Sequence, residues 1–332
     1  MQQLVVAVAC TAIALVLIIS TIIYTHFTYS AEPKENRTDF NALQSQPKLP
    51  PDYKECGRSF VYNETDALTR GMNDNEEQWT WLALFFKRSF KKDIKCIGSL
   101  VTKRHVLTLA TCFMKNDSTM EKIDPSEMLV RLGRYWRTNS NEAGYVYRDI
   151  ANYTIHPNYT QQTNSNLSKY VVDSDLAVAV LRTSVEYSSM IKPICLWTYL
   201  SNLQDMFEIS GFIVSWPGSV YYKGEFNLLR PTVLKIQMED QMKCKLHYRD
   251  LASLDLKQTI CAGTKNAWFA VIIGTGNSLV IRDSATGHYL LRGILTTRWV
   301  SCKNCPVLRE RYYVFIDVIK HISWIYKQIN LI

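Results

Sequence analysis

The sequence predicts an all-β protein that ends in an α-helix. Segments such as residues 104–112 alternate apolar with polar residues and are rich in Val, Leu and Thr, a pattern typical of half-buried strands. Toward the C-terminus, apolar residues recur at helical spacing and would share one helix face: Phe315, Val318, Ile319, Ile322, Ile325 and Ile329. The 332 residues are 47% hydrophobic and 20% charged, which indicates a globular chain of one large domain or two small ones with terminal segments.

An apolar run without charges extends from Leu4 to Tyr24. At about 1.5 Å per residue it is long enough to cross a bilayer core of about 30 Å, and it exceeds the usual signal-peptide core of about 7–15 residues. Thr28 and Ser30 are small residues at which a signal peptidase could cut. Residues 1–30 are therefore predicted to be either a signal peptide or a signal anchor. The rest of the chain would be secreted, or anchored as a type II membrane protein with its main domain outside the cell.

Glycosylation motifs and cysteines also indicate export. Six N-x-S/T sequons begin at Asn36, Asn63, Asn116, Asn152, Asn158 and Asn166. Of the nine cysteines, Cys10 lies in the apolar run and eight follow it, an even number suited to disulfides in an oxidising compartment. Residues 31–67 are predicted to be a polar, proline-containing linker or pro-segment that contains Cys56.

Part of the formal net charge of +8 lies in one run of basic residues, namely Lys87, Arg88, Lys91, Lys92 and Lys95. This run is either an ordinary solvated face or a contact patch for a polyanion or an acidic protein. No nucleic-acid motif accompanies it.

Several short segments of the sequence match motifs of one known protein family. They are WLALF at 81–85, CIGSLV at 96–101, RHVLTLATC at 104–112, QTICAG at 258–263 and VIIGTGNSLV at 271–280. These phrases resemble motifs of the chymotrypsin/trypsin-like (S1) serine proteases, and the resemblance covers residues 55–332. It implies two antiparallel six-stranded β-barrels packed side by side with a C-terminal helix, the protease-like domain occupying residues 68–332.

The resemblance also implies disulfides. It pairs the tethering Cys56 with Cys195, Cys96 with Cys112, and Cys244 with Cys261. A local Cys302–Cys305 disulfide is expected for the remaining C-x-x-C motif, with an intermolecular bond as the alternative. No metal or cofactor is expected, because a metal site needs further ligands and a redox site needs a βαβ pattern.

The segments that match the family's catalytic motifs are altered in this chain. Thr111 stands at the position of the general base, Thr275 at that of the nucleophile and Ile273 at that of the oxyanion-hole glycine, while Asp175 matches the aspartate of the triad. Threonine has no group that titrates near neutral pH, so Thr111 cannot accept a proton from a nucleophile. A shifted alignment would make Ser278 the nucleophile, still without a base.

The activation and substrate-binding positions are altered as well. Leu68–Gly71 aligns with the activation sequence, Ala67 replaces the basic residue at the cleavage site, and Gly274 replaces the aspartate that would bind the new amino terminus. Three bulky residues occupy positions of the primary specificity pocket: Phe269, Arg298 and Tyr313.

Together these changes predict a non-catalytic serine protease homologue. It would act by binding an extracellular protein, an active protease or its substrate, as a cofactor, decoy or adaptor in a proteolytic cascade. The alternatives are an atypical active S1-type endopeptidase and a membrane-anchored adhesion or receptor ectodomain.

Overall fold

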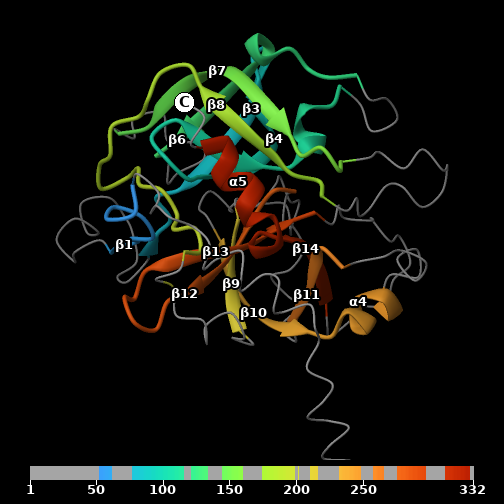
Figure 1. Cartoon of the computed structure of the whole chain (residues 1–332). Helices are drawn as coiled ribbons and strands as arrows, with labels where there is room; N and C mark the ends of the chain where they lie inside the picture. The colour runs from blue at the N-terminus through green and yellow to red at the C-terminus, as the bar shows by residue number, and fades with distance from the viewer. Residues whose placement is uncertain are drawn as a thin grey trace, which may run out of the picture. The chain divides into compact units, whose positions relative to one another are not determined.

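The described part of the protein is built from two closed antiparallel β-barrels of six strands each (Figure 1). A computed structural model describes residues 52–61, 77–115, 121–133, 144–159, 174–198, 201, 210–215, 232–247, 257–264, 275–296 and 311–329. The two-barrel fold expected from the sequence is confirmed. Within these ranges no helix is long and apolar enough to span a membrane, and the apolar run at residues 4–24 lies outside them.

The first barrel, here called the N-barrel, has the strand order β3-β4-β5-β8-β7-β6. Its strands are β3 (Leu82–Lys87), β4 (Phe90–Leu100), β5 (His105–Thr108), β6 (Met128–Leu132), β7 (Val146–Ile155) and β8 (Ala177–Leu181). Strands β5 and β6 are buried throughout, and Phe85 meets Phe113 edge-on in the core. The sequence pattern predicted a strand over 104–112, but only His105–Thr108 is extended. The chain then turns into a short 3-10 helix, η1 (Ala110–Phe113), which carries Cys112 back to Cys96 on β4.

The second barrel, the C-barrel, has the strand order β10-β11-β14-β13-β12-β9. Its strands are β9 (Ser210–Ser215), β10 (Thr232–Glu239), β11 (Thr259–Thr264), β12 (Ser278–Arg282), β13 (Tyr289–Leu295) and β14 (Arg311–Asp317). A short helix, α4 (Gln241–His247), follows β10, and the Cys244–Cys261 disulfide fastens it to β11.

The C-terminal helix begins later than the periodicity predicts. Phe315 and Ile316 lie in β14, where Phe315 pairs with Ile260 of β11, and α5 occupies only Ile322–Ile329 after a turn of 3-10 helix at Ile319–His321. The strand ends at Asp317, whose carboxylate accepts a hydrogen bond from the backbone N–H of Ile319. The strand pairing and burial of Phe315 therefore outweigh the helical spacing of the apolar residues in deciding its conformation.

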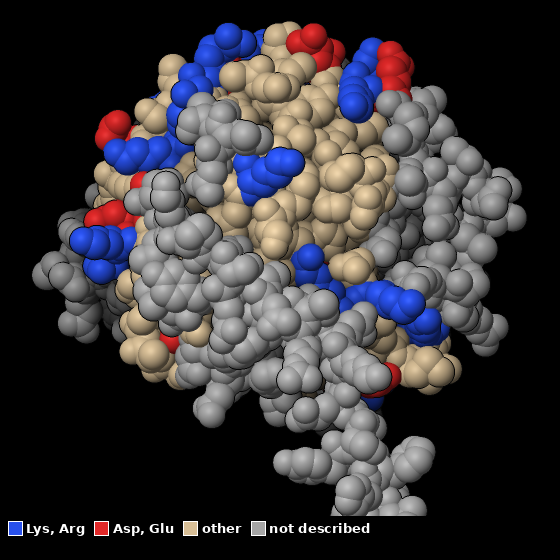
Figure 2. Space-filling model, viewed as in Figure 1, with Lys and Arg blue, Asp and Glu red and all other residues tan. Residues whose placement is uncertain are grey.

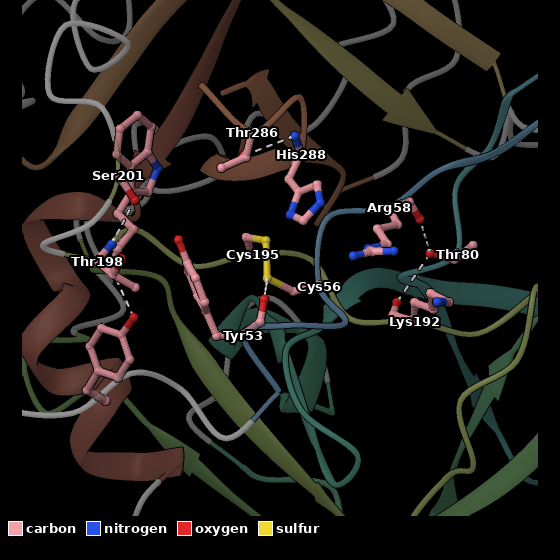
Figure 3. Close-up of a disulfide and its surroundings, with 12 residues drawn as sticks. Tyr53, Cys56, Arg58, Thr80, Lys192, Cys195, Thr198, Ser201, Thr286 and His288 are labelled. Carbon is pink, nitrogen blue, oxygen red and sulfur yellow. Dashed lines mark hydrogen bonds between the residues drawn. A yellow bond between two sulfur atoms is a disulfide. The ribbon is translucent and has the colours of Figure 1, made fainter. Parts of the chain in front are cut away.

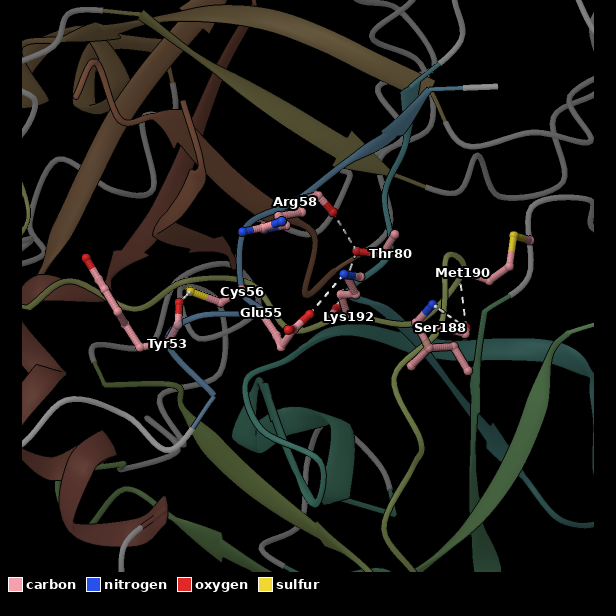
Figure 4. Close-up of polar contacts among 9 residues, drawn as sticks. Tyr53, Glu55, Cys56, Arg58, Thr80, Ser188, Met190 and Lys192 are labelled. Atoms are coloured by element: carbon pink, nitrogen blue, oxygen red, sulfur yellow. Dashed lines mark hydrogen bonds and ion pairs between the residues drawn. The ribbon is translucent and has the colours of Figure 1, made fainter. Parts of the chain in front are cut away.

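Residues 52–61, which lie within the expected linker, are docked against the barrels (Figures 3 and 4). The Cys56–Cys195 disulfide joins this tether to the connection between the barrels, and Glu55 forms an ion pair with Lys192 at 3.0 Å. The hydroxyl of Thr80 donates a hydrogen bond to the carbonyl oxygen of Arg58 at 3.0 Å. Farther along, β1 (Phe60–Val61) pairs with β2 (Glu77–Gln78), so the two ends of segment 62–76 are held together.

Three of the four expected disulfides are present, namely Cys56–Cys195, Cys96–Cys112 and Cys244–Cys261. Cys302 and Cys305 lie outside the described residues.

We expect Gly57→Ala to destabilise the protein by about 3 kcal/mol. Gly57 has a φ of +68°, and an added Cβ would lie 2.5 Å from the carbonyl oxygen of Tyr289, a backbone atom that cannot rotate away. Gly287→Ala is the matched control, because Gly287 has a similar φ of +72° but its nearest neighbour to a Cβ is the Arg282 side chain at 3.7 Å. Chemical denaturation of both variants measures the difference, and an equal loss in both would contradict close packing of the tether.

Candidate functional site

Thr275, at the nucleophile position, lies where the two barrels touch. The loop before β12 rests on the N-barrel, since the backbone N–H of Ile97 donates to the carbonyl oxygen of Thr275 at 3.2 Å. Gly276 follows with a φ of +90°, and a Cβ there would lie 2.0 Å from the carbonyl oxygen of Ile97. Only glycine fits this close approach of two backbones.

Thr111 and Asp175 form the polar centre of the site. The Thr111 hydroxyl donates a hydrogen bond to Oδ2 of Asp175 at 3.0 Å, and the Thr111 backbone N–H donates to Oδ1 at 2.9 Å. Asp175 is only 2% exposed, so its charge needs these donors. The structure therefore brings together these two residues, and the one hydroxyl proton of Thr111 is committed to the carboxylate.

The two hydroxyls considered as nucleophiles differ in exposure. Thr275 is partly exposed, and its hydroxyl forms no hydrogen bond with any residue that the structure describes. Ser278 is fully buried on β12, and its Oγ lies 2.5 Å from Oγ of Ser99, a buried residue of β4. The Ser278 hydroxyl thus joins the two barrels and faces no open space.

His105 is the histidine nearest to Thr111 in the sequence, but its side chain forms a hydrogen bond with Thr102. The hydroxyl of Thr102 accepts hydrogen bonds from the backbone N–H groups of Arg104 and His105, so its own proton is directed to Nδ1 of His105 at 2.7 Å. Burial, with the nearby charge of Arg104, lowers the pKa of His105 to about 4. The ring is therefore a neutral structural group of β5.

A cluster that sequence reasoning missed lies beside Asp175. Ser174, with a φ of +60°, directs its hydroxyl to Nε2 of His321 at 3.2 Å, and Nδ1 of His321 lies 2.9 Å from the carbonyl oxygen of Asp317. A carbonyl only accepts, so Nδ1 of His321 carries a proton and, in the neutral ring, Nε2 accepts from Ser174. The ring of His156 meets His321 edge-on.

This cluster fastens the C-terminal segment to the N-barrel. Ser174 precedes β8 and His156 follows β7, whereas His321 ends the 3-10 turn ahead of α5. The hydroxyl of Tyr326 on α5 adds a hydrogen bond to the carbonyl oxygen of Trp197 at 2.9 Å. No motif in the sequence marks these partners, because they meet only after the barrels have formed.

Of the three expected pocket residues, the structure describes only Tyr313. It lies on β14, is 4% exposed and packs in the C-barrel core with Ile213, Ala262 and Phe315. Phe269, Arg298 and the oxyanion position Ile273 lie outside the described residues.

The structure describes two of the six predicted glycosylation sites. Asn152 and Asn158 are exposed, as an N-glycosylation site requires, while Asn36, Asn63, Asn116 and Asn166 lie outside the described residues.

In the basic run, Arg88 forms an ion pair with Asp149, and the Lys95 ammonium donates a hydrogen bond to the carbonyl oxygen of Met114. Lys87 is partly exposed, and the structure does not describe the side chains of Lys91 and Lys92.

Within the described ranges, no group of three or more His, Cys, Asp or Glu residues is arranged to hold a metal ion.

Comparison with known proteins identifies a family. A family model described as Trypsin matches residues 68–325. The chain is 28% identical over 301 residues to "Serine protease gd" of Drosophila melanogaster, covering 78% of this chain and 51% of that protein. It is 26% identical over 283 residues to "Clotting factor C" of Tachypleus tridentatus, covering 81% of this chain and 26% of that protein. "Melanization protease 1" of Drosophila melanogaster is 25% identical over 310 residues, which are 87% of this chain and 72% of that protein. The chain thus spans about half the length of the first relative and about a quarter of the second.

We expect Thr111→Val to lower the free energy of unfolding by about 1.5–3 kcal/mol, the value of a hydrogen bond to a charged group. Valine has the shape of threonine but leaves Oδ2 of the buried Asp175 without the hydroxyl. Thr111→Ser keeps the hydroxyl and is the control. Equal stability of the two variants in urea denaturation would show that the hydroxyl does not support the carboxylate.

We also expect the protein to lose stability as the pH falls from about 6.5 to about 4. Burial lowers the pKa of His105 and of His156 to about 4, with the charge of His321 adding to the effect on His156. In this window the unfolded chain binds protons at both rings and the folded chain does not, so protonation favours unfolding. A fall in pKa from 6.5 to about 4 corresponds to about 3 kcal/mol for each ring, so we expect a loss of several kcal/mol across this pH range.

Denaturation across this pH range is compared between the parent protein and His156→Phe, which keeps an aromatic ring beside Trp324. The variant should show a shallower dependence on pH. An unchanged slope would remove His156 from this explanation.

Proposed function

Because the chain belongs to the trypsin family, we propose that it is a non-catalytic member that acts outside the cell by binding other proteins. The observation that carries this proposal is the pairing of Thr111 with Asp175. At the position from which a base must take the proton of the nucleophile, the side chain is a hydroxyl that donates its own proton to the aspartate.

Acyl transfer by this type of site needs a nucleophile, a base within hydrogen-bond reach and donors aimed at the oxyanion. Thr275 has a hydroxyl, but no described side chain accepts its proton. Ser278, the other hydroxyl in the loop, is fully buried against Ser99. Both arrangements favour a protein that keeps the protease fold without its chemistry.

The names of relatives suggest where such a protein would act. "Clotting factor C" and "Melanization protease 1" are named for clotting and melanization, and both are similar to this chain over most of its length. Three disulfides are suited to the same extracellular setting. We propose that the protein is a cofactor, decoy or adaptor in a proteolytic cascade, with an active protease or its substrate as the partner.

The catalytic half of this proposal is tested with a fluorophosphonate probe, which forms an adduct with activated hydroxyls. The purified full chain is treated with the probe, before and after exposure to trypsin, and is read by intact mass and peptide mapping. We expect no adduct at Thr275 or Ser278, while active trypsin in parallel is labelled completely. A stoichiometric adduct that disappears in Thr275→Ala or in Ser278→Ala would overturn the proposal and identify the nucleophile.

The binding half is tested by measuring how fast an active relative cleaves its zymogen substrate with and without this chain. A cofactor or adaptor raises the rate and a decoy lowers it at concentrations near those of the two proteins. No change in rate and no measurable association with either protein would contradict the proposed role.

A further inference from the structure

Three arginines surround the short segment that follows β8. Nε and Nη2 of Arg104 both donate to the carbonyl oxygen of Leu181 at 3.3 Å. Nε of Arg148, on β7, donates to the carbonyl oxygen of Ser184 at 3.2 Å. Arg182 lies within the segment itself and is exposed. We call Arg104, Arg148 and Arg182 the arginine patch.

Two of the three guanidinium groups of the patch, those of Arg104 and Arg148, are held in place by neutral acceptors. Arg148 also donates from Nη1 to the carbonyl oxygen of Tyr147 at 2.9 Å, and none of the three arginines forms an ion pair with a described carboxylate. A guanidinium has five N–H donors, so bonds to two or three carbonyls leave other donors free for a ligand. The guanidinium groups of Arg104 and Arg148 are thus fixed in position, which reduces the entropy lost on binding, and no described carboxylate pairs with any of the three arginines.

The nearest carboxylates have other partners. The Asp149 carboxylate pairs with Arg88 at 2.5 Å, while its backbone carbonyl accepts the N–H of Arg182 at 2.7 Å. Glu186 lies 3.5 Å from the ammonium of Lys103. Because these two carboxylates already pair with Arg88 and Lys103, the three arginines of the patch keep a net positive charge. Figure 2 shows groups of basic side chains along the upper-left edge of the N-barrel face.

We propose that the arginine patch binds a linear sulfated polysaccharide of the heparin type. Arginine matches tetrahedral oxyanions with two parallel hydrogen bonds, and several cations around one segment suit a chain that carries several sulfates. The patch shares no residue with the basic run at Lys87–Lys95, although Arg88 of that run pairs with Asp149, the neighbour of Arg148. The proposal does not depend on whether the chain is catalytic.

A polysaccharide fits this surface better than an acidic protein segment. Protein interfaces are centred on apolar and aromatic side chains that become fully buried. Of the large apolar side chains that are exposed in the described part of the protein, Met242 and Leu246 belong to α4, and only Tyr147, 40% exposed, adjoins the patch. The patch therefore offers charged groups and little exposed apolar surface.

The test uses the full chain and a heparin decasaccharide, with affinity measured at several sodium chloride concentrations. In the triple variant R104Q/R148Q/R182Q we expect binding to weaken about tenfold or more, and the slope of log Kd against log salt to fall by about one for each arginine removed. The matched control K122Q/K235Q/K327Q removes the same charge from exposed residues of other elements and should retain most of the affinity. Chemically desulfated heparin should not compete.

Arg182→Gln alone keeps the test decisive if the triple variant unfolds. The Arg182 side chain makes no hydrogen bond to a described residue, so the single variant should keep its melting temperature while the salt slope falls by about one. Equal weakening in the triple variant and its control, or an unchanged slope in Arg182→Gln, would overturn the proposal. A poly-glutamate peptide that competes as well as the decasaccharide would also overturn it, in favour of an acidic protein partner.

Discussion

The candidate site depends on the need to satisfy one buried carboxylate. Asp175 is almost completely buried beside the junction of the barrels, where an unpaired charge would be costly. Thr111 meets this need with a backbone N–H and a hydroxyl, one for each oxygen. The same aspartate that would orient a base in an active relative thus becomes a structural acceptor, and a neutral threonine is sufficient to hold it.

The described supports of the fold are residues other than those at the triad positions. Gly276 is still a glycine because its backbone approaches that of Ile97 too closely for any side chain. The Cys56–Cys195, Cys96–Cys112 and Cys244–Cys261 disulfides and the buried strands likewise serve packing. Substitution of Thr111 and Thr275 leaves these supports untouched, because neither residue fills the core of a barrel.

The surface gives the scaffold another means of recognition. Arg104 and Arg148, held by backbone carbonyls, present charge without the flexibility that usually weakens exposed cations. The arginine patch lies among β7, the end of β8 and the residue before β5, whereas Thr275 precedes β12. A ligand at the patch could therefore bring the protein to a sulfated matrix and leave the loops around Thr275 available for a protein partner.

The sequence by itself determined the strand segments, which are encoded locally in the alternation of apolar and polar residues. The pairing of six cysteines and the residues at the triad positions were predicted from short motifs that resemble those of the serine proteases. The extent of the C-terminal helix was predicted less well, because strand pairing of Phe315 with Ile260 competes with the local helical pattern.

Only the tertiary structure decided which side chains meet. Thr111 bonds to a residue 64 positions away, Ser99 to one 179 positions away and Ser174 to one 147 positions away. The arginine patch likewise gathers residues from three separate segments. Such contacts follow from barrel closure and strand register, where one residue of shift would turn every side chain to the opposite face. For that reason the identity of the residues at the site could be predicted from the sequence, whereas their hydrogen bonds could not.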